Sequence, residues 1–293
     1  MKLLFSEASA DYGHYIFPYA IWAFPESSET PADIFHQGFL PSSRDLDRFY
    51  MCRHIRIDLR RFGSSSENRR ILRNGAGIEV ELLPRAGFEY TPRRREFFKT
   101  YADTKFGRGT MSDERLDSLF AARLTTHILL FTDTSAGKEV GAATLYLEPP
   151  RMAYYYYAFY DLDYFPRNLG MFMMTAAVQL FATKGFDFLY LGSCYSRNAL
   201  YKTQFAGAQF FNGVRWSADL EELKYLVARE DATKHLLESE DYRSKFCAEG
   251  LLGLAQASSF GAGISARAPG VAQPSSAASS GAVPPPATHR DSA

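Results

Sequence analysis

A polar loop that runs from Asp161 to Gly170, and a short polar segment at Tyr201 and Lys202, hold the residue types best suited to chemistry. The carboxylate of Asp161 can accept a proton from an amine, and the Tyr201 hydroxyl or Lys202 ammonium can donate to a developing oxyanion. Arg167 and Gly170 precede an apolar run, an arrangement in which backbone N–H groups at a helix N-terminus can bind a phosphate. Together these residue types can accept a proton and bind an anion.

Each of these residues also has a plain structural interpretation. Asp161 can cap the helix that starts near Gly170, because Asp is a favoured capping residue. Arg167 can be a surface charge, and Lys202 can be a solvated charge on a helix. The residue types alone leave both interpretations open.

Hydrophobic periodicity predicts the elements that position these residues. Strands are expected at 53–59, 79–83, 127–132, 139–147, 152–160, 188–191 and 208–216. Helices are expected at 32–38, 68–73, 92–104, 113–122, 169–184, 198–205, 221–229 and 233–238, with loop and a short strand in 12–24. From about residue 257 the chain is rich in Ala, Ser, Pro and Gly, which predicts a disordered tail. Asp161 then directly follows the strand expected at 152–160, and Tyr201 and Lys202 follow the strand expected at 188–191.

Charged residues balance overall but are unevenly spread. Residues 44–108 hold 16 Arg and Lys against 9 Asp and Glu, whereas 217–249 hold 5 against 9. This asymmetry favours a polyanion partner for the basic part; the alternative is a solvated surface whose charges balance across the fold. No apolar run approaches the ~18 residues of a membrane span, and the 3 cysteines have neither disulfide-framework nor zinc spacing. We therefore expect a cytoplasmic protein with no membrane contact, metal or cofactor.

The order strand, loop, helix, strand, helix, strand over 153–210 resembles the centre of N-acetyltransferase folds. It implies an α+β protein: an N-acetyltransferase-like (GNAT) mixed sheet flanked by helices at 111–250, a smaller N-terminal α/β subdomain at 1–110, and the tail at 257–293. In coenzyme A enzymes the loop reads Gln/Arg-x-x-Gly-x-Gly/Ala, but here Phe172 holds the last position. We expect its ring to occupy the space of a phosphate, which favours an acyl donor other than coenzyme A.

Four further segments carry a closer resemblance. They are Phe159-Tyr160-Asp161-Leu162-Asp163, Arg167-Asn168-Leu169-Gly170, Tyr190-Leu191-Gly192 and Tyr201-Lys202-Thr203-Gln204-Phe205. Together with Ser64, Ser66, Arg69 and Arg70, they resemble the arginyl-tRNA–protein transferases and bacterial aspartate/glutamate leucyltransferases over about residues 35–215. The chain departs from that family in its cysteine cluster, which has shrunk to Cys52, and at Phe106 and Leu162, where the family commonly has His and Pro. These departures leave open a different specificity or a loss of activity.

The resemblance implies transfer of arginine or leucine from aminoacyl-tRNA to the α-amino group of proteins with an acidic or oxidised N-terminal residue, which marks them for degradation. It implies catalytic roles for Asp161, as proton acceptor, and for Tyr201 and Lys202. The residues expected to bind tRNA or the acceptor are Arg56, Arg69, Arg70, Arg73, Tyr101, Lys105, Tyr156, Arg167 and Gly170. The alternatives are a coenzyme A-dependent N-acetyltransferase and a catalytically inactive relative that binds tRNA or protein.

Overall fold

The computed structural model describes residues 1–260, apart from 12, 14–15, 230–234 and 259. Residues Met1–Phe260 form one compact unit. Of the tail predicted at 257–293, the residues from 261 onward lie outside the described residues, as does the start of the helix predicted at 233–238. The start of that predicted tail is instead part of the compact unit: Ala257 ends a helix, and the Phe260 ring packs on the Phe39 and Phe211 rings with centroids 5.8 and 6.3 Å apart. The domain boundary expected near residue 110 stays a prediction.

An eight-stranded mixed sheet has the order β12-β11-β5-β10-β9-β8-β7-β6. Its strands are β5 (His54–Asp58), β6 (Ile78–Pro84), β7 (His127–Asp133), β8 (Lys138–Glu148), β9 (Met152–Tyr160), β10 (Phe188–Ser193), β11 (Ala208–Phe211) and β12 (Trp216–Ser217). Strands β6 to β9 form an antiparallel meander, and β5 is inserted antiparallel to both β10 and β11. Strand β10 is parallel to β9, and such a step needs a crossover connection, which the helix α5 (Leu169–Thr183) supplies.

A second, four-stranded sheet is built by the N-terminal part, in the order β1-β2-β4-β3. Its strands are β1 (Lys2–Glu7), β2 (Tyr19–Phe24), β3 (Phe39–Pro41) and β4 (Phe49–Met51), and α1 (Pro31–His36) lies between β2 and β3 in sequence. Buried aromatic rings of this part, such as Phe35, pack on Tyr154 and Tyr190 of the large sheet with ring centroids 5.1 and 5.0 Å apart.

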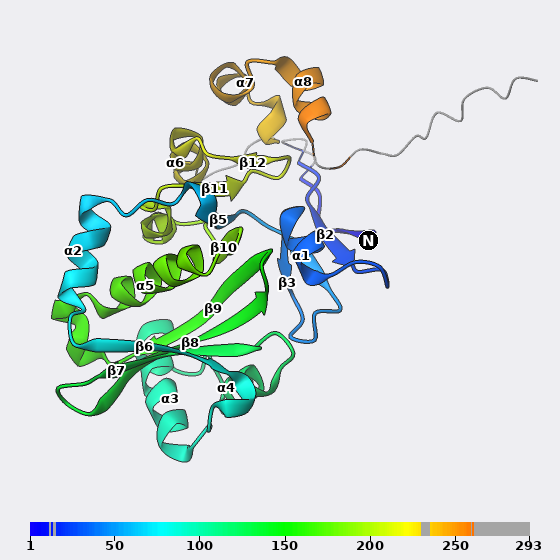
Figure 1. Ribbon diagram of the computed structural model, residues 1–293. Coiled ribbons are helices and arrows are strands. Elements are labelled where there is room, and N and C mark those ends of the chain that lie inside the picture. The colour runs from blue at the N-terminus through cyan, green and yellow to red at the C-terminus, as the bar shows by residue number, and fades with distance from the viewer. Residues whose placement is uncertain (12, 14–15, 230–234, 259, 261–293) are drawn as a thin grey trace, which may run out of the picture. The chain divides into compact units, whose positions relative to one another are not determined.

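Helices cover both faces of the large sheet (Figure 1). Helix α5 and α2 (Ser66–Asn74) lie on one face, and α3 (Pro92–Phe106) and α4 (Asp113–Ala121) lie on the other. Nine of the α5 residues are buried, as expected for a helix that is apolar on nearly every side. Helix α2 has its N-cap at Ser65 and its C-cap at Gly75, close to the ends predicted from the sequence.

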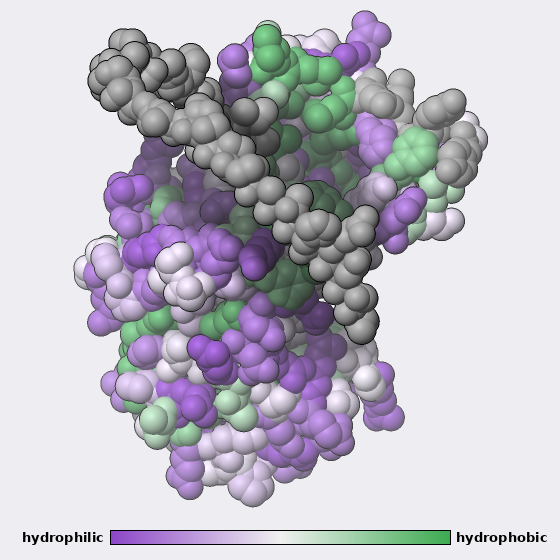
Figure 2. All heavy atoms as spheres, turned by 90° about the vertical axis from the view of Figure 1, so that its right-hand side faces the viewer, coloured by the Kyte–Doolittle hydropathy of each residue, from purple (hydrophilic) through white to green (hydrophobic). Residues whose placement is uncertain are grey.

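The remaining helices lie after the large sheet or form short turns. They are α6 (Leu220–Ala228), α7 (Glu240–Phe246), α8 (Gly250–Ala257), and the 3-10 helices η1 (Leu59–Arg61), η2 (Arg85–Gly87), η3 (Leu162–Arg167), η4 (Arg197–Thr203) and η5 (Leu236–Glu238). Among the described residues, no helix is long and apolar enough to cross a bilayer. On the face in Figure 2, hydrophobic side chains gather mainly at the upper end, and hydrophilic ones dominate elsewhere.

The structure confirms the expected mixed sheet flanked by helices but corrects some elements. The single strand predicted at 208–216 is wrong, because Asn212 breaks it into a hairpin: its side-chain oxygen accepts hydrogen bonds from the backbone of Val214 and Arg215. The segment predicted as a helix at 198–205 is the 3-10 helix η4. The alternation of side chains between the two faces of the sheet is broken along β9, because its pairing with β8 shifts between Thr144 and Leu145 and leaves Tyr156 as an extra residue.

Candidate functional site

Strands β9 and β10 separate after only three paired residues. Their pairing runs from Met152 opposite Phe188 to Tyr154 opposite Tyr190, and no residue beyond Tyr154 pairs with the described part of β10. On its other side, β10 changes register against β5 between Tyr190 and Gly192. The carboxyl ends of two parallel strands therefore diverge at one edge of the sheet, and the predicted catalytic residues follow these two ends.

Four tyrosines gather where the strands diverge: Tyr155 and Tyr160 of β9, Tyr101 of α3 and Tyr201 of η4. The Tyr101 and Tyr160 ring centroids lie 4.7 Å apart. Burial raises the pKa of Tyr101, Tyr155 and Tyr201, and the neighbouring tyrosine hydroxyls raise these pKa values further. The phenols of Tyr101, Tyr155 and Tyr201 therefore stay protonated at neutral pH, so each of the three can donate a hydrogen bond.

Lys202 places an ammonium beside the end of β10. Its Nζ donates to the Ser193 carbonyl oxygen at 2.9 Å, and no carboxylate of the described residues lies within ion-pair distance of it. Burial lowers the pKa of Lys202. An ammonium carries three donors, so Lys202 has capacity to bind an oxygen of a substrate.

Asp161 directly follows β9 and begins η3. One of its carboxylate oxygens accepts from the backbone N–H of Asp163 at 3.0 Å, and the other accepts from Nζ of Lys138 at 2.5 Å. The ion pair raises the pKa of Lys138. Asp161 is therefore a helix cap, but it caps η3 rather than α5, whose N-cap is Asn168.

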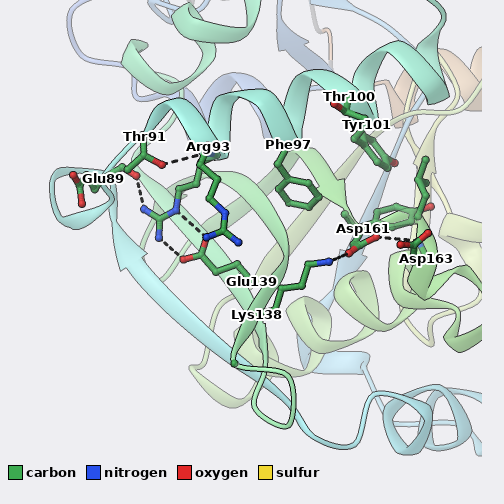
Figure 3. A pocket seen from close by; sticks show the side chains of 14 residues that line it. Glu89, Thr91, Arg93, Phe97, Thr100, Tyr101, Lys138, Glu139, Asp161 and Asp163 are labelled. Atoms are coloured by element: carbon green, nitrogen blue, oxygen red, sulfur yellow. Dashed lines mark hydrogen bonds and ion pairs between the residues drawn. The ribbon is translucent and has the colours of Figure 1, made fainter.

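A cavity of about 670 Å³ opens between α3 and the adjoining ends of β8 and β9 (Figure 3). The residues that line it are Glu89, Thr91, Arg93, Arg94, Phe97, Thr100, Tyr101, Gly137, Lys138, Glu139, Tyr160, Asp161, Leu162 and Asp163. Of the site residues predicted from the sequence, Tyr101 and Asp161 lie here. Lys138 was missed, although the antiparallel pairing of two predicted strands would have placed the start of β8 beside the residue after β9.

Arg167 and Gly170 stabilise the loop before α5. The Arg167 guanidinium donates to the carbonyls of Asn74 and Ala76 at 3.3 and 2.8 Å and to the carboxylate of Asp133 at 3.2 Å. A Cβ on Gly170 would lie 2.9 Å from the Tyr160 ring, so this glycine lets the Tyr160 side chain lie against the first turn of α5. Most of the Arg167 donors are thus already used within the protein.

Phe172 does not lie over the phosphate-type loop, so that expectation is wrong. Its ring is only 5% exposed and packs edge-on to Phe131, with centroids 6.1 Å apart. A Cβ on Gly75 would lie 2.1 Å from the same ring. Phe172 is therefore a packing residue between α5 and the end of α2.

The other predicted binding residues lie in separate places. Arg56 is 8% exposed, lies over the rings of Phe188 and Trp216 at 4.1 and 3.8 Å, and donates to Gln209 at 2.8 Å. Lys105 lies over the Phe165 ring at 5.3 Å.

Tyr156 contacts Tyr154 and Tyr157, with ring centroids 5.3 and 4.6 Å apart. Arg69, Arg70 and Arg73 are all exposed on α2, where Arg70 pairs with Glu67 at 2.6 Å.

The described residues contain no group of three or more potential metal ligands. Cys52, Cys194 and Cys247 are all buried free thiols. Burial raises the pKa of Cys52 to about 12, so this thiol is protonated and unreactive at neutral pH.

Solved structures offer distant likenesses. The C-terminal domain of a lysylphosphatidylglycerol synthetase from Agrobacterium fabrum matches with a TM-score of 0.39 and 16% identity, over 49% of this chain and 46% of that one. FemX matches with a TM-score of 0.37 and 12% identity, over 48% and 53%. A GCN5-related N-acetyltransferase from Sphaerobacter thermophilus matches with a TM-score of 0.33 and 14% identity, over 65% and 57%.

Curated proteins give a consistent sequence match, although no family model matches the chain. An aspartate/glutamate leucyltransferase of Alkalilimnicola ehrlichii is 28% identical over 208 residues, which is 66% of this chain and 84% of the relative. The enzyme of the same name from Granulibacter bethesdensis is 29% identical over 58% and 66%, and that from Ruegeria pomeroyi is 26% identical over 57% and 62%. The resemblance inferred from the motifs is thereby confirmed: the chain is a sequence relative of the bacterial aspartate/glutamate leucyltransferases.

Proposed function

We propose that this protein transfers an aminoacyl group from an aminoacyl-tRNA to the α-amino group at the N-terminus of an acceptor protein. The observation that carries the proposal is the divergence of β9 and β10, where Tyr201 and Lys202 lie beside one strand end and Asp161 follows the other. The names of the curated relatives support the same class of reaction.

The reaction joins the acceptor nitrogen to the ester carbonyl carbon and breaks the bond from that carbon to the ribose oxygen. The α-ammonium first loses a proton, for which Asp161 is the acceptor. The pKa of an α-amino group, about 8, leaves a usable neutral fraction of the amine at pH 7. The amine then attacks, and the carbonyl oxygen develops negative charge. Tyr201 and Lys202 donate to this oxygen, which lowers the barrier. The second amine proton ends on the leaving ribose oxygen.

The transferred residue in this proposal is leucine or arginine, and the acceptor begins with an acidic or oxidised residue. Lys138, which lines the cavity and is paired with Asp161, is the cation that can meet such a side chain, whereas the side chains of Arg56 and Arg167 bind other groups of the protein. The exposed arginines of α2 offer contacts to tRNA phosphates. The reaction would take place in the cytoplasm and mark the product for degradation.

The experiment is a transfer assay with purified full-length protein, labelled leucyl-tRNA or arginyl-tRNA, and peptides that begin with Asp, Glu, oxidised Cys or Ala. We expect label to enter acidic peptides and the Asp161→Ala and Lys202→Met variants to lose rate while they remain folded. Transfer from acetyl-CoA instead would show a coenzyme A-dependent acetyltransferase. Binding of tRNA without any transfer would show a non-catalytic relative.

A further inference from the structure

The cavity beside Asp161 is longer than one amino-acid residue requires. Tyr101 and Arg93 both line it from α3, and their eight-residue separation corresponds to about 12 Å at 1.5 Å per residue. An extended peptide advances about 3.3 Å per residue, so roughly three to four residues fit along that length. The volume of about 670 Å³ lies in the range of pockets that hold whole small ligands.

The two ends of the cavity differ in chemistry (Figure 3). One end presents Tyr101, Asp161 and Asp163, together with Lys138, which is paired with Asp161. Its carboxylates suit a peptide α-ammonium. The cavity lining as a whole holds three cationic side chains (Arg93, Arg94, Lys138) and four carboxylates (Glu89, Glu139, Asp161, Asp163). This balance disfavours a polynucleotide and favours a peptide.

The other end presents one cation, Arg93, that makes no ion pair with the described residues, although its charge, together with the hydrogen bonds and charge of Arg94, lowers the pKa of Glu139. Arg94 binds both oxygens of Glu139, at 2.9 and 2.5 Å, so these two charges offset each other. Arg93 is exposed and makes no ion pair within 4 Å with any residue that the structure describes. The Glu89 carboxylate points away from the cavity in Figure 3. Phe97 lies between the two ends and supplies an apolar wall.

We infer that this cavity binds the acceptor peptide beyond its first residue and selects among side chains there, an inference that rests on the proposed function. The first three or four residues lie extended along α3, with the α-amine at Asp161. A carboxylate side chain at the third or fourth residue then pairs with Arg93, while Phe97 contacts a residue that lies between the first residue and this acidic one. The protein therefore prefers acceptors with an acidic residue at position three or four over otherwise identical acceptors with lysine there.

The test measures binding and transfer separately. Fluorescence polarisation of C-terminally labelled peptides, without tRNA, compares peptides of one sequence that carry Glu, Ala or Lys at positions three and four. An ion pair at a partly exposed site contributes about 1 kcal/mol or less. We therefore expect the peptide with Glu to bind about fivefold more tightly than the peptide with Lys. Arg93→Glu should reverse the order. Arg123→Glu makes the same charge change at an exposed arginine outside the cavity and should leave the preference unchanged.

The outcomes separate this inference from the proposed function. A peptide preference that follows Arg93, in binding and in KM for transfer, supports the inference. Normal transfer with no dependence on positions three and four, or with equal effects of Arg93→Glu and Arg123→Glu, overturns it and leaves the proposed function standing. Absence of both peptide binding and transfer overturns both.

Discussion

Phe172 and Gly75 allow a sharp test of how α5 packs on α2. Phe172→Ala removes a ring that is 5% exposed, and such a substitution lowers the free energy of unfolding by about 3–5 kcal/mol. Gly75→Ala adds a methyl group 2.1 Å from that ring, far inside carbon–carbon contact distance, and overpacking of this kind costs about 1–3 kcal/mol. In the Phe172→Ala background the methyl group enters vacated space, so its cost should largely vanish.

Urea unfolding of the wild type, both single variants and the double variant measures this coupling, which we expect to be about 1–3 kcal/mol. The same four proteins can be heated with acetyl-CoA, which should stabilise none of them. Strictly additive costs would contradict the packing described above. A Phe172→Ala variant of unchanged stability that gains affinity for acetyl-CoA would instead restore the interpretation that the ring blocks a phosphate site.

Three further results are expected. Ser135 and Tyr164 donate to the Asp133 carboxylate and hold its pKa well below its usual range. The ionised carboxylate therefore stabilises the fold above the unfolded pKa of ~3.9, and this stabilisation is lost as the pH falls below that value. The urea midpoint should drop more between pH 7 and pH 3 in the wild type than in Asp133→Asn. Gly170→Ala pushes a Cβ to within 2.9 Å of the Tyr160 ring, so the transfer rate should fall while the urea midpoint stays near that of the wild type; an unaffected rate would show that the Tyr160 position is unimportant. Burial lowers the pKa of Lys202. If transfer depends on its ammonium, the rate should fall as pH rises, with a midpoint below the ~10.4 of an ordinary lysine. Lys202→Arg should move that midpoint to higher pH; identical pH–rate profiles would exclude the role.

Local signals predicted most strands of the large sheet and the helices that cover it, but not β1, β3, β4, α7 or α8. The serines before α2 and Gly75 after it marked both ends of that helix, because a serine side chain satisfies the first N–H groups. The consecutive strands β7, β8 and β9 followed from their apolar patterns and the short turns between them. These features depend on residues close together in sequence, and such information is present in any short segment.

Pairings between strands far apart in the sequence, and the hydrogen-bond partners of individual side chains, could not be predicted from the sequence. Nothing around β5 indicates that it lies between β10 and β11, since that pairing joins segments more than 100 residues apart. The Arg167 side chain was expected to meet a ligand, but its acceptors are the carbonyl of the last residue of α2, a carbonyl in the turn that follows, and the carboxylate of Asp133. For Asp161 the sequence left open a proton acceptor or a cap of the helix that starts near Gly170; its carboxylate caps η3, and α5 has Asn168 as its N-cap.

The insertion of β5 has a consequence for synthesis on the ribosome. All five of its residues are buried, yet its neighbour β10 begins at Phe188, about 130 residues later. At the usual elongation rate of about 5–20 residues per second, that interval lasts roughly 6–26 seconds. During this time the nascent strand has no partner on either edge and is open to association with other chains. The central sheet can close only after β10 has been synthesised, so chaperones that shield extended apolar segments should act on this protein before its site exists.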